Sequence, residues 1–182
     1  MRYEELAIEG RNPVLEAFRA GKTIDKLYIL DGSQDGPVKS ILREAKKTDT
    51  IIQFVPKERL DQLSESKKHQ GVIALAAAYE YAQVDELLEL AKKKGEPPFL
   101  ILLDNIEDPH NLGAIIRTAN VVGAHGIIIP KRRAAGLTST VAKTSAGAIN
   151  YTPVAKVTNL TKTIKELKEK GNVLTQRREN AA

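Results

Sequence analysis

Apolar residues in the first part of the chain alternate between short continuous runs and helical spacing. The runs KLYIL (26–30), IIQFV (51–55) and GVIALAAA (71–78) are typical of strands. Between the first two, Val38, Ile41, Leu42 and Ala45 stand at i, i+3, i+4 and i+7, which predicts a helix with one apolar face. Shorter helices are predicted over 12–20, with Asn12 as its cap, and over 56–63. This pattern predicts a small α/β unit that ends near residue 78.

A second alternating series follows a short linker, YEYAQ, and a helix over 84–94 that GEPP interrupts. Strands are predicted over 99–103, 126–130 and 152–157, and helical segments over 111–123, 139–148 and 159–170. The strands FLILL and GIIIP are apolar throughout, which is typical of a parallel sheet that is covered on both faces. The sequence therefore predicts two α/β domains, at 1–78 and 84–182, joined by a linker at 79–83.

Composition excludes several classes of site. The 182 residues contain no cysteine, so neither disulfides nor thiolate metal sites can form. The three histidines, His69, His110 and His125, are scattered along the chain, and we expect no metal centre. The N-terminus lacks an apolar signal-peptide core, and no apolar run approaches the length of a membrane span. We therefore expect a cytoplasmic protein without a membrane partner.

The charge balance points to an anionic partner. The net charge is +5 and the isoelectric point is about 9.3, which favours binding to phosphates. Many ordinary proteins are mildly basic, so charge alone does not establish nucleic-acid binding. Aromatic residues make up only 4% of the chain and tryptophan is absent, which argues against an extended base-stacking platform.

Polar residues collect where the strand FLILL is followed by a helix, in DPHNLGAIIRTANVVGAHGIIIP (108–130). Ligands of open parallel sheets bind at the carboxyl ends of the strands, beside helix N-termini. Asn111 is predicted to cap the helix, and Arg117 can direct a guanidinium group towards a phosphate or carboxylate. The alternative is that Asn111 only caps and Arg117 is a solvated helix residue. His110 lacks an obvious catalytic partner, and the neighbouring carboxylates are best explained as loop solvation.

A basic loop follows the strand GIIIP. It carries Lys131, Arg132 and Arg133, and the segment after it adds Lys143 and Ser145. If this loop lies on the same sheet edge as Arg117, it forms a surface that can bind phosphates. The alternative is a solvated run of charges. The sequence contains no dinucleotide-binding glycine motif and no P-loop, which argues against dehydrogenase and NTPase functions.

The stretch LDNIEDPHNLGAIIRTANVVGAHGIIIPKRRAAGLTSTVAKTSAGA resembles the first signature of the SpoU/TrmH family of RNA ribose 2′-O-methyltransferases, which belong to the trefoil-knotted SPOUT class. The N-terminal part, with HQGV at 69–72, resembles the small ribosomal-protein-like substrate-binding domain of the subgroup that modifies 23S ribosomal RNA. The similarity runs from about residue 8 to 171. It implies an α/β RNA-binding domain followed by a parallel-sheet SPOUT domain.

The resemblance also assigns roles to residues. It places Asn111 and Arg117 where the target ribose meets the methyl donor, S-adenosylmethionine, and gives Arg117 a part in removing the 2′-hydroxyl proton. Because a guanidinium group is a poor base, stabilisation of an alkoxide or assistance by a phosphate fits the chemistry better. RNA contacts are implied in both parts of the chain, at Arg11, His69, Gln70, Lys131, Arg132, Arg133, Lys143 and Ser145. The family further implies a homodimer.

The sequence departs from the family after residue 171. The family's Gly-rich loop and final helix, which form the knot and hold S-adenosylmethionine, have no counterpart before QRREN, which resembles the end of that helix. We therefore expect an incomplete SPOUT domain without an assigned cofactor site. Three functions stay open: ribosomal RNA 2′-O-methylation, RNA binding without catalysis, and transfer RNA 2′-O-methylation. An intact mass near 20.0 kDa would favour RNA binding alone.

Overall fold

The computed structural model of the protein describes residues 6–171 and divides them into two compact units. The first unit contains the described residues up to 80 together with 136–144, and the second contains 81–135 together with the residues from 145 onwards. None of the helices within 6–171 is long and apolar enough to cross a membrane.

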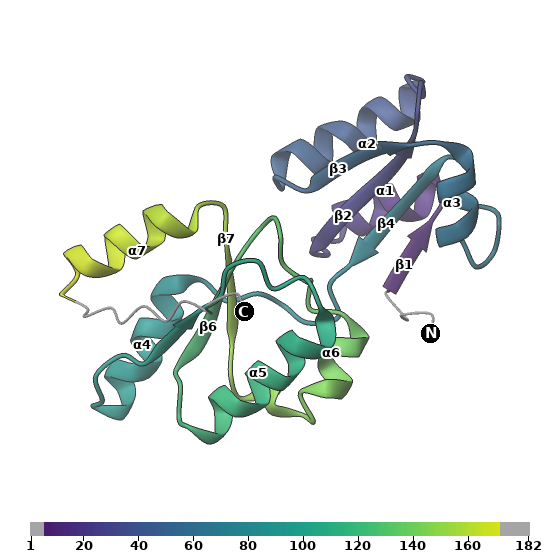
Figure 1. The fold of residues 1–182 in the computed structure, drawn as a ribbon. Helices are drawn as coiled ribbons and strands as arrows, with labels where there is room; N and C mark the ends of the chain where they lie inside the picture. The colour runs from purple at the N-terminus through teal and green to yellow at the C-terminus, as the bar shows by residue number, and fades with distance from the viewer. Residues whose placement is uncertain (1–5, 172–182) are drawn as a thin grey trace, which may run out of the picture. The chain divides into compact units, whose positions relative to one another are not determined.

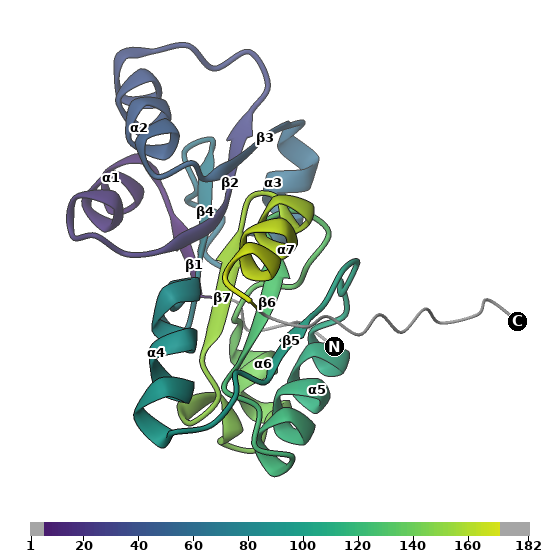
Figure 2. The same ribbon diagram turned by 90° about the vertical axis from the view of Figure 1, so that its left-hand side faces the viewer.

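The first unit is built on a four-stranded mixed sheet in the order β1-β4-β2-β3 (Figure 1). Strands β2 and β3 run parallel, whereas β4 is antiparallel to both of its neighbours, β1 and β2. Figure 2 shows helices α1 and α2 on one side of this sheet and α3 on the other. The elements are β1 (Leu6–Glu9), α1 (Arg11–Arg19), β2 (Ile24–Leu30), α2 (Gly36–Lys47), β3 (Ile51–Val55), α3 (Lys57–Leu63) and β4 (Val72–Ala76).

Alternation along β2 explains how this sheet is covered on both faces. Leu27 and Ile29 belong to the core that α1 and α2 cover, together with Ile41 of α2. Tyr28, which points the other way, packs with Leu60 of α3. All five side chains are at most 6% exposed. The apolar spacing in the sequence therefore predicted the helices and central strands of this unit correctly.

Two features at the start of this unit differ from the sequence prediction. Strand β1, which has polar and partly exposed positions, was not predicted and exists because it pairs with β4. Asn12 is not the cap of α1, because the helix begins at Arg11 and its N-cap is Gly10, two residues before Asn12. Gly10 has φ 94°, a conformation that glycine adopts far more readily than other residues.

The second unit contains a three-stranded parallel sheet in the order β5-β6-β7. Helices α4 and α7 cover one face and α5 covers the other (Figures 1 and 2). The central strand β6 is buried along its whole length, as the apolar run GIIIP predicts. The elements are α4 (Val84–Lys94), β5 (Leu100–Leu102), α5 (Pro109–Val121), β6 (Gly126–Pro130), η1 (Ala148–Asn150), β7 (Val154–Val157) and α7 (Leu160–Glu169). The predicted fold class, two α/β parts with a parallel sheet in the second, is confirmed.

The short segment that contains α6 (Ser139–Thr144) groups with the first unit, which differs from the predicted continuous domain at 84–182. Leu137 is 1% exposed, and its carbonyl accepts a hydrogen bond of 2.7 Å from the backbone N–H of Ala78. Gly136 lies so close to Asp25 that a Cβ atom there would stand 2.1 Å from a carboxylate oxygen. These contacts join residues far apart in sequence, which periodicity cannot reveal.

Candidate functional site

The carboxyl edge of the second sheet carries two loops that are fixed by backbone hydrogen bonds. Residues 103–108 follow β5 and residues 131–135 follow β6. Ile106 and Ala134 form a parallel bridge, and the N–H of Ala135 donates to the carbonyl of Ile106 at 2.7 Å. The N–H of Lys131 donates to the carbonyl of Val157 at 2.8 Å. Since these bonds use main-chain atoms, they hold the loops without the side chains.

Helix α5 begins at this edge, and its cap is Asp108, not Asn111 as the sequence predicted. The Asp108 carboxylate accepts a hydrogen bond of 2.7 Å from the N–H of His110, and Pro109 occupies the first helical position. Proline is well suited to that position because its fixed φ matches the helix and it has no N–H group to leave unpaired. Asn111 therefore lies within the first turn, and its amide is exposed and not needed as a cap.

Asn111 and Arg117 are both exposed on α5, but the helix does not place them on one face. They are six residues apart, and at about 100° per residue their side chains leave the helix about 120° apart. Within residues 6–171, neither side chain makes a hydrogen bond or an ion pair. Both remain available to a ligand, and a substrate that touches both must wrap around the start of α5.

The basic loop is held in an unusual backbone conformation. Arg133 has φ 59° and Asn105, in the facing loop, has φ 56°. Left-handed conformations cost about 1–2 kcal/mol for residues other than glycine. The Arg133 guanidinium lies 3.5 Å from the Asp104 carboxylate, and both side chains are exposed. Arg132 is exposed and Lys131 is half-buried, so the loop presents its positive charge unevenly.

Lys143 and Ser145, which follow this loop in the sequence, differ in exposure and in the unit to which they belong. Ser145 is fully buried, so its hydroxyl group is not presented to RNA, contrary to the sequence prediction. Lys143 is exposed on α6, which belongs to the first unit, whereas Lys131, Arg132 and Arg133 belong to the second.

Arg11 and Gln70, predicted to contact RNA, contact each other in the first unit. The backbone N–H of Arg11 donates to the Gln70 side-chain oxygen at 3.2 Å, and Arg11 Nε donates to the Gln70 carbonyl at 3.1 Å. The same guanidinium lies 2.6 Å from the carboxylate of Asp35. The charge of Arg11 is therefore largely neutralised by its neighbours.

His69 is buried, which conflicts with the prediction of a direct RNA contact. Only 6% of the residue is exposed. Its Nδ1 accepts a hydrogen bond from the N–H of Gly71 at 3.0 Å, and its Nε2 lies 3.0 Å from the Asp61 carboxylate. This arrangement requires the proton of the neutral ring on Nε2. The ring therefore orients the loop before β4 and presents neither nitrogen to solvent.

Glu9 anchors the same loop, and the sequence prediction missed it. Its carboxylate accepts hydrogen bonds from the Ser64 hydroxyl at 2.6 Å, from the Glu65 N–H at 2.7 Å and from the Ser66 hydroxyl. Partial burial raises the pKa of Glu9, but these hydrogen bonds together outweigh it and leave the pKa below its ordinary value. The loop consequently presents two exposed lysines, Lys67 and Lys68, from a fixed position.

The two loops at the carboxyl edge do not fit S-adenosylmethionine by themselves. Neither 103–108 nor 131–135 contains a glycine that would let a backbone amide approach the cofactor closely. No residue of these loops is therefore assigned to the cofactor. Within the described chain, no group of three His, Cys, Asp or Glu side chains could hold a metal ion.

Comparison with known families matches both parts of the chain. Residues 7–82 match the family described as RNA 2′-O ribose methyltransferase substrate binding. Residues 98–182 match the SpoU rRNA methylase family. The two matches fall on either side of α4, in agreement with the two patterns of elements in the sequence.

Individual relatives of this chain carry the same family name. YacO of Bacillus subtilis, named as a TrmH-family tRNA/rRNA methyltransferase, is 51% identical over 162 residues, which are 89% of this chain and 65% of that protein. A Staphylococcus epidermidis protein with the same family name is 51% identical over 168 residues, 92% of this chain and 67% of its own length.

Among solved structures, one match is the SpoU methyltransferase AviRb of Streptomyces viridochromogenes in complex with AdoMet. The TM-score is 0.42 and the sequence identity is 21%, and the match covers 92% of this chain and 60% of AviRb. The chain thus spans about two thirds of the length of the relatives that it matches. On the identity with these relatives and the two family matches, the chain belongs to the SpoU/TrmH family of RNA methyltransferases.

Proposed function

We propose that this protein acts in the 2′-O-methylation of a ribose in ribosomal RNA, with S-adenosylmethionine as the methyl donor. The observation that carries the proposal is Arg117, an exposed arginine on α5 without a protein partner within 6–171, in the segment that matches the SpoU rRNA methylase family. An exposed arginine without a partner is ready to bind an anionic group of a substrate.

In this proposal, Arg117 stabilises negative charge on the RNA at the reacting ribose. A guanidinium group stays protonated at neutral pH, so it cannot act as the base. It can stabilise the 2′-oxygen as that atom loses its proton, and it can hold the adjacent phosphate with two parallel hydrogen bonds. Asn111 has an amide that can both donate to and accept from a ribose hydroxyl.

RNA binding in the proposal is divided between the two units. Lys131, Arg132 and Arg133 contact phosphates beside the reacting ribose. In the first unit, Lys143 and the lysines at 67 and 68 contact the RNA backbone, whereas Arg11 and Gln70 hold the loop in place. Phosphate contacts of this kind position the substrate without reading its sequence.

Two other functions lead to different outcomes. RNA binding without catalysis is favoured by the lack of glycine in the two edge loops. A transfer RNA substrate is consistent with the names of the relatives, which include both RNA classes. The match of 7–82 to an RNA methyltransferase substrate-binding family favours an RNA ligand for all three functions.

The experiment is methyl transfer from tritiated S-adenosylmethionine to protein-free ribosomal RNA and to transfer RNA. The label must resist alkaline hydrolysis of the RNA, because a 2′-O-methyl group blocks cleavage of the adjacent phosphodiester. Labelled ribosomal RNA supports the proposal, and labelled transfer RNA alone would replace it with the transfer RNA function. RNA binding without any label would establish the non-catalytic function.

We further propose a homodimer in the cytoplasm, as the family implies. Light scattering on the protein during activity measurements tests the assembly. A fully active monomer would contradict the dimer.

A further inference from the structure

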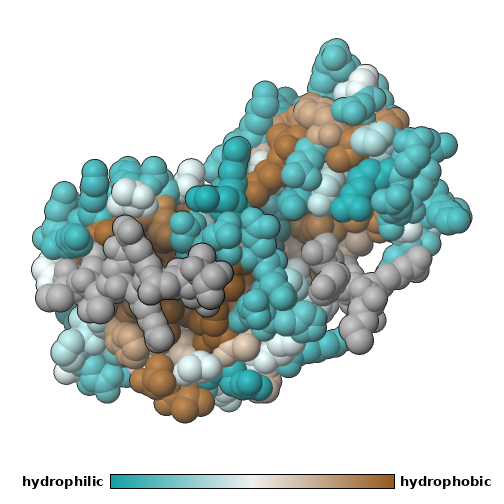
Figure 3. All heavy atoms as spheres, viewed as in Figure 1, coloured by the Kyte–Doolittle hydropathy of each residue, from teal (hydrophilic) through white to brown (hydrophobic). Residues whose placement is uncertain are grey.

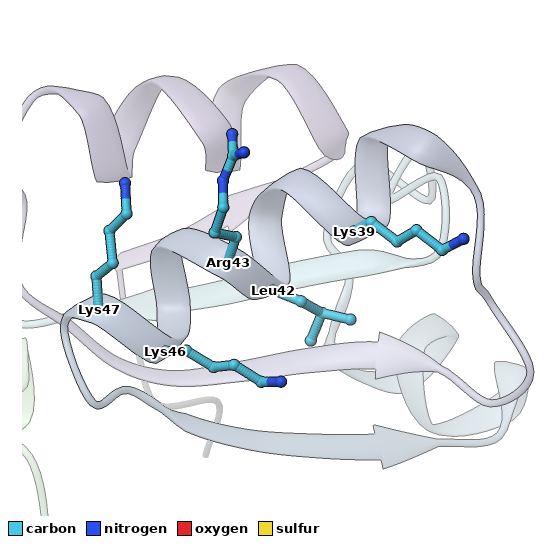
Figure 4. Close-up of a pocket in the computed structure, with 5 residues that line it drawn as sticks. All are labelled: Lys39, Leu42, Arg43, Lys46 and Lys47. Carbon is cyan, nitrogen blue, oxygen red and sulfur yellow. The ribbon is translucent and has the colours of Figure 1, made fainter.

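Helix α2 presents a basic surface that the proposed site does not use. Lys39, Leu42 and Lys46 stand at i, i+3 and i+7, on one side of the helix. Figure 4 shows Leu42 and Lys46 pointing from the helix towards the strands beside it, whereas Arg43 and Lys47 point away from them. Five side chains of α2 line an open hollow of about 550 Å³: Lys39, Leu42, Arg43, Lys46 and Lys47.

The positive charge of this hollow is only partly balanced. Glu44 lies 2.9 Å from Lys47 and 3.8 Å from Arg43, so both of those cations share one carboxylate. The side chains of Lys39 and Lys46 make no ion pair or hydrogen bond within residues 6–171. Four cations and one carboxylate leave a local excess of positive charge, which is costly unless an anion or solvent balances it.

An exposed aromatic ring lies on the same side of the sheet. Phe54 of the edge strand β3 is 51% exposed. It pairs in register with Ile29, which is fully buried beneath α1 and α2, and alternation places Ile52 on the same face. Ile52 and Leu42 pack against that same core. The two helices cover the inner strands but leave the ring at the edge in contact with solvent. Figure 3 shows apolar patches between hydrophilic side chains on the surface of the first unit.

We propose that Lys39, Leu42, Lys46 and Phe54, here called the α2–β3 surface, bind an unpaired segment of RNA. The two lysines contact backbone phosphates, and Phe54 stacks on a base. Base–aromatic stacking tolerates any base sequence but requires a base that is not already stacked in a helix. The ring and the lysines together therefore fit single-stranded RNA, whereas lysines alone would fit a duplex equally well.

The choice of RNA over another polyanion rests on the RNA binding in the proposed function and does not depend on methyl transfer. The α2–β3 surface is distinct from α5 and from the loop at 64–71. It would give the first unit a second hold on the substrate, through a bulge, loop or end of the RNA. Such a contact adds affinity and restricts which structured RNAs can bind.

The first arm of the test measures the lysines. The full chain is titrated with a fluorescent single-stranded RNA of about 12 nucleotides and with the corresponding duplex, at several salt concentrations. Lys39→Ala/Lys46→Ala should lower the slope of log K against log salt for the single strand by about 1.4, since each lost phosphate contact is worth about 0.7. Lys57→Ala/Arg59→Ala is the matched control, because it removes the same charge from α3 on the opposite face of the sheet.

The second arm measures the ring. Phe54→Ala should weaken binding of the single strand by about tenfold and leave duplex binding unchanged, whereas Phe54→Tyr should retain affinity. Thermal unfolding checks that each variant is folded. If the wild-type chain binds the single strand but neither substitution weakens it more than the control does, the α2–β3 surface is not an RNA site. If the wild-type chain binds no RNA even at low salt, the proposed function fails first.

Discussion

The two units hold their surface loops by different means. In the first unit, side chains hold the loop before β4: Glu9 binds residues 64–66, His69 binds Asp61 and Gly71, and Arg11 binds Gln70. In the second unit, main-chain bonds join the loops at the carboxyl edge, while the side chains of Asn111 and Arg117 make no hydrogen bond or ion pair to residues 6–171. A polar side chain that is engaged in holding a loop has fewer donors and acceptors left for a substrate, and so the second unit is the better candidate for chemistry.

In the second unit, side chains also hold a loop in place, but at the other edge of the sheet. His125, which is 3% exposed, accepts a hydrogen bond of 3.1 Å from the N–H of Phe99, and its Nε2 lies 3.0 Å from the Glu96 carboxylate. His69 of the first unit has the same pattern of contacts. Because His125 immediately precedes β6 and Phe99 precedes β5, these His125 contacts lie at the amino edge of the sheet. On α5, which begins at the carboxyl edge, the exposed side chains of Asn111 and Arg117 make no such contact within residues 6–171.

The largest effect is expected at Arg117. In the active protein, Arg117→Ala should reduce methyl transfer by about 10²–10⁴-fold, the range for loss of a positioned charge-stabilising group. Arg117→Lys should restore little, because a point charge cannot reproduce a planar two-pronged contact. Asn111→Ala should have an intermediate effect, and it should not weaken the helix end, because Asp108 is the cap.

Single-turnover methylation at saturating donor measures these rates, with circular dichroism to check folding. Methyl transfer by Arg117→Ala at the wild-type rate would show that this exposed arginine takes no part in the reaction.

Arg132 is an exposed cation of the basic loop without an ion pair within residues 6–171, whereas Arg11 is paired to Asp35. Replacing Lys131, Arg132 and Arg133 with alanine should weaken binding to ribosomal RNA roughly tenfold or more and reduce its salt dependence by about one unit per lost phosphate contact. Arg11→Ala should change the salt slope much less, since its charge is already balanced by Asp35 at 2.6 Å. Equal changes in slope for Arg11→Ala and Arg132→Ala would show that pairing does not remove a cation from RNA binding.

Gly126→Ala should destabilise the framework that holds the second unit's loops. A Cβ atom at 126 would lie 2.5 Å from a methyl carbon of Leu87, a fully buried side chain of α4. Overpacking of this kind costs about 1–3 kcal/mol. Urea unfolding measures the change. Gly36→Ala is the control, since a Cβ atom there would meet nothing within 4 Å. Equal stability of the two variants would mean that Leu87 moves aside at little cost.

The smallest effect is expected from Glu9→Gln in the first unit. The folded-state pKa of Glu9 lies below the ordinary value of 4.5, so its contribution to stability is present above that pH and is lost as the pH falls through the lowered pKa. Because much of the carboxylate is solvated, we expect a loss of about 1 kcal/mol or less at neutral pH. Hydrogen exchange of residues 64–68 at neutral and acidic pH should show a weaker pH dependence in the variant. An unchanged pH dependence would assign the acid sensitivity to another carboxylate.

Much of the fold could be predicted because apolar spacing is a local signal. The positions of α2, β3, α4 and β6 follow the pattern within one or two residues. The candidate site was less predictable. Asn111 and Asn12 were both predicted as caps, yet each lies inside its helix, because the cap depends on the backbone conformation of Asp108 and Gly10. A suitable residue type near a helix start does not determine which residue adopts that conformation.

The sequence by itself determined the alternating elements, the two α/β patterns and membership of the family, since each depends on the order of residue types along the chain. Only the tertiary structure decided which polar residues are used internally. Histidine and serine often bind ligands, but His69 and Ser145 are both buried, whereas Arg117 is exposed. Likewise, β1 exists because β4 pairs with it, and 136–144 groups with the first unit through Ala78. The physical reason is the same in each case: a polar group is satisfied by whichever partner the fold brings near, and that partner is often far away in sequence.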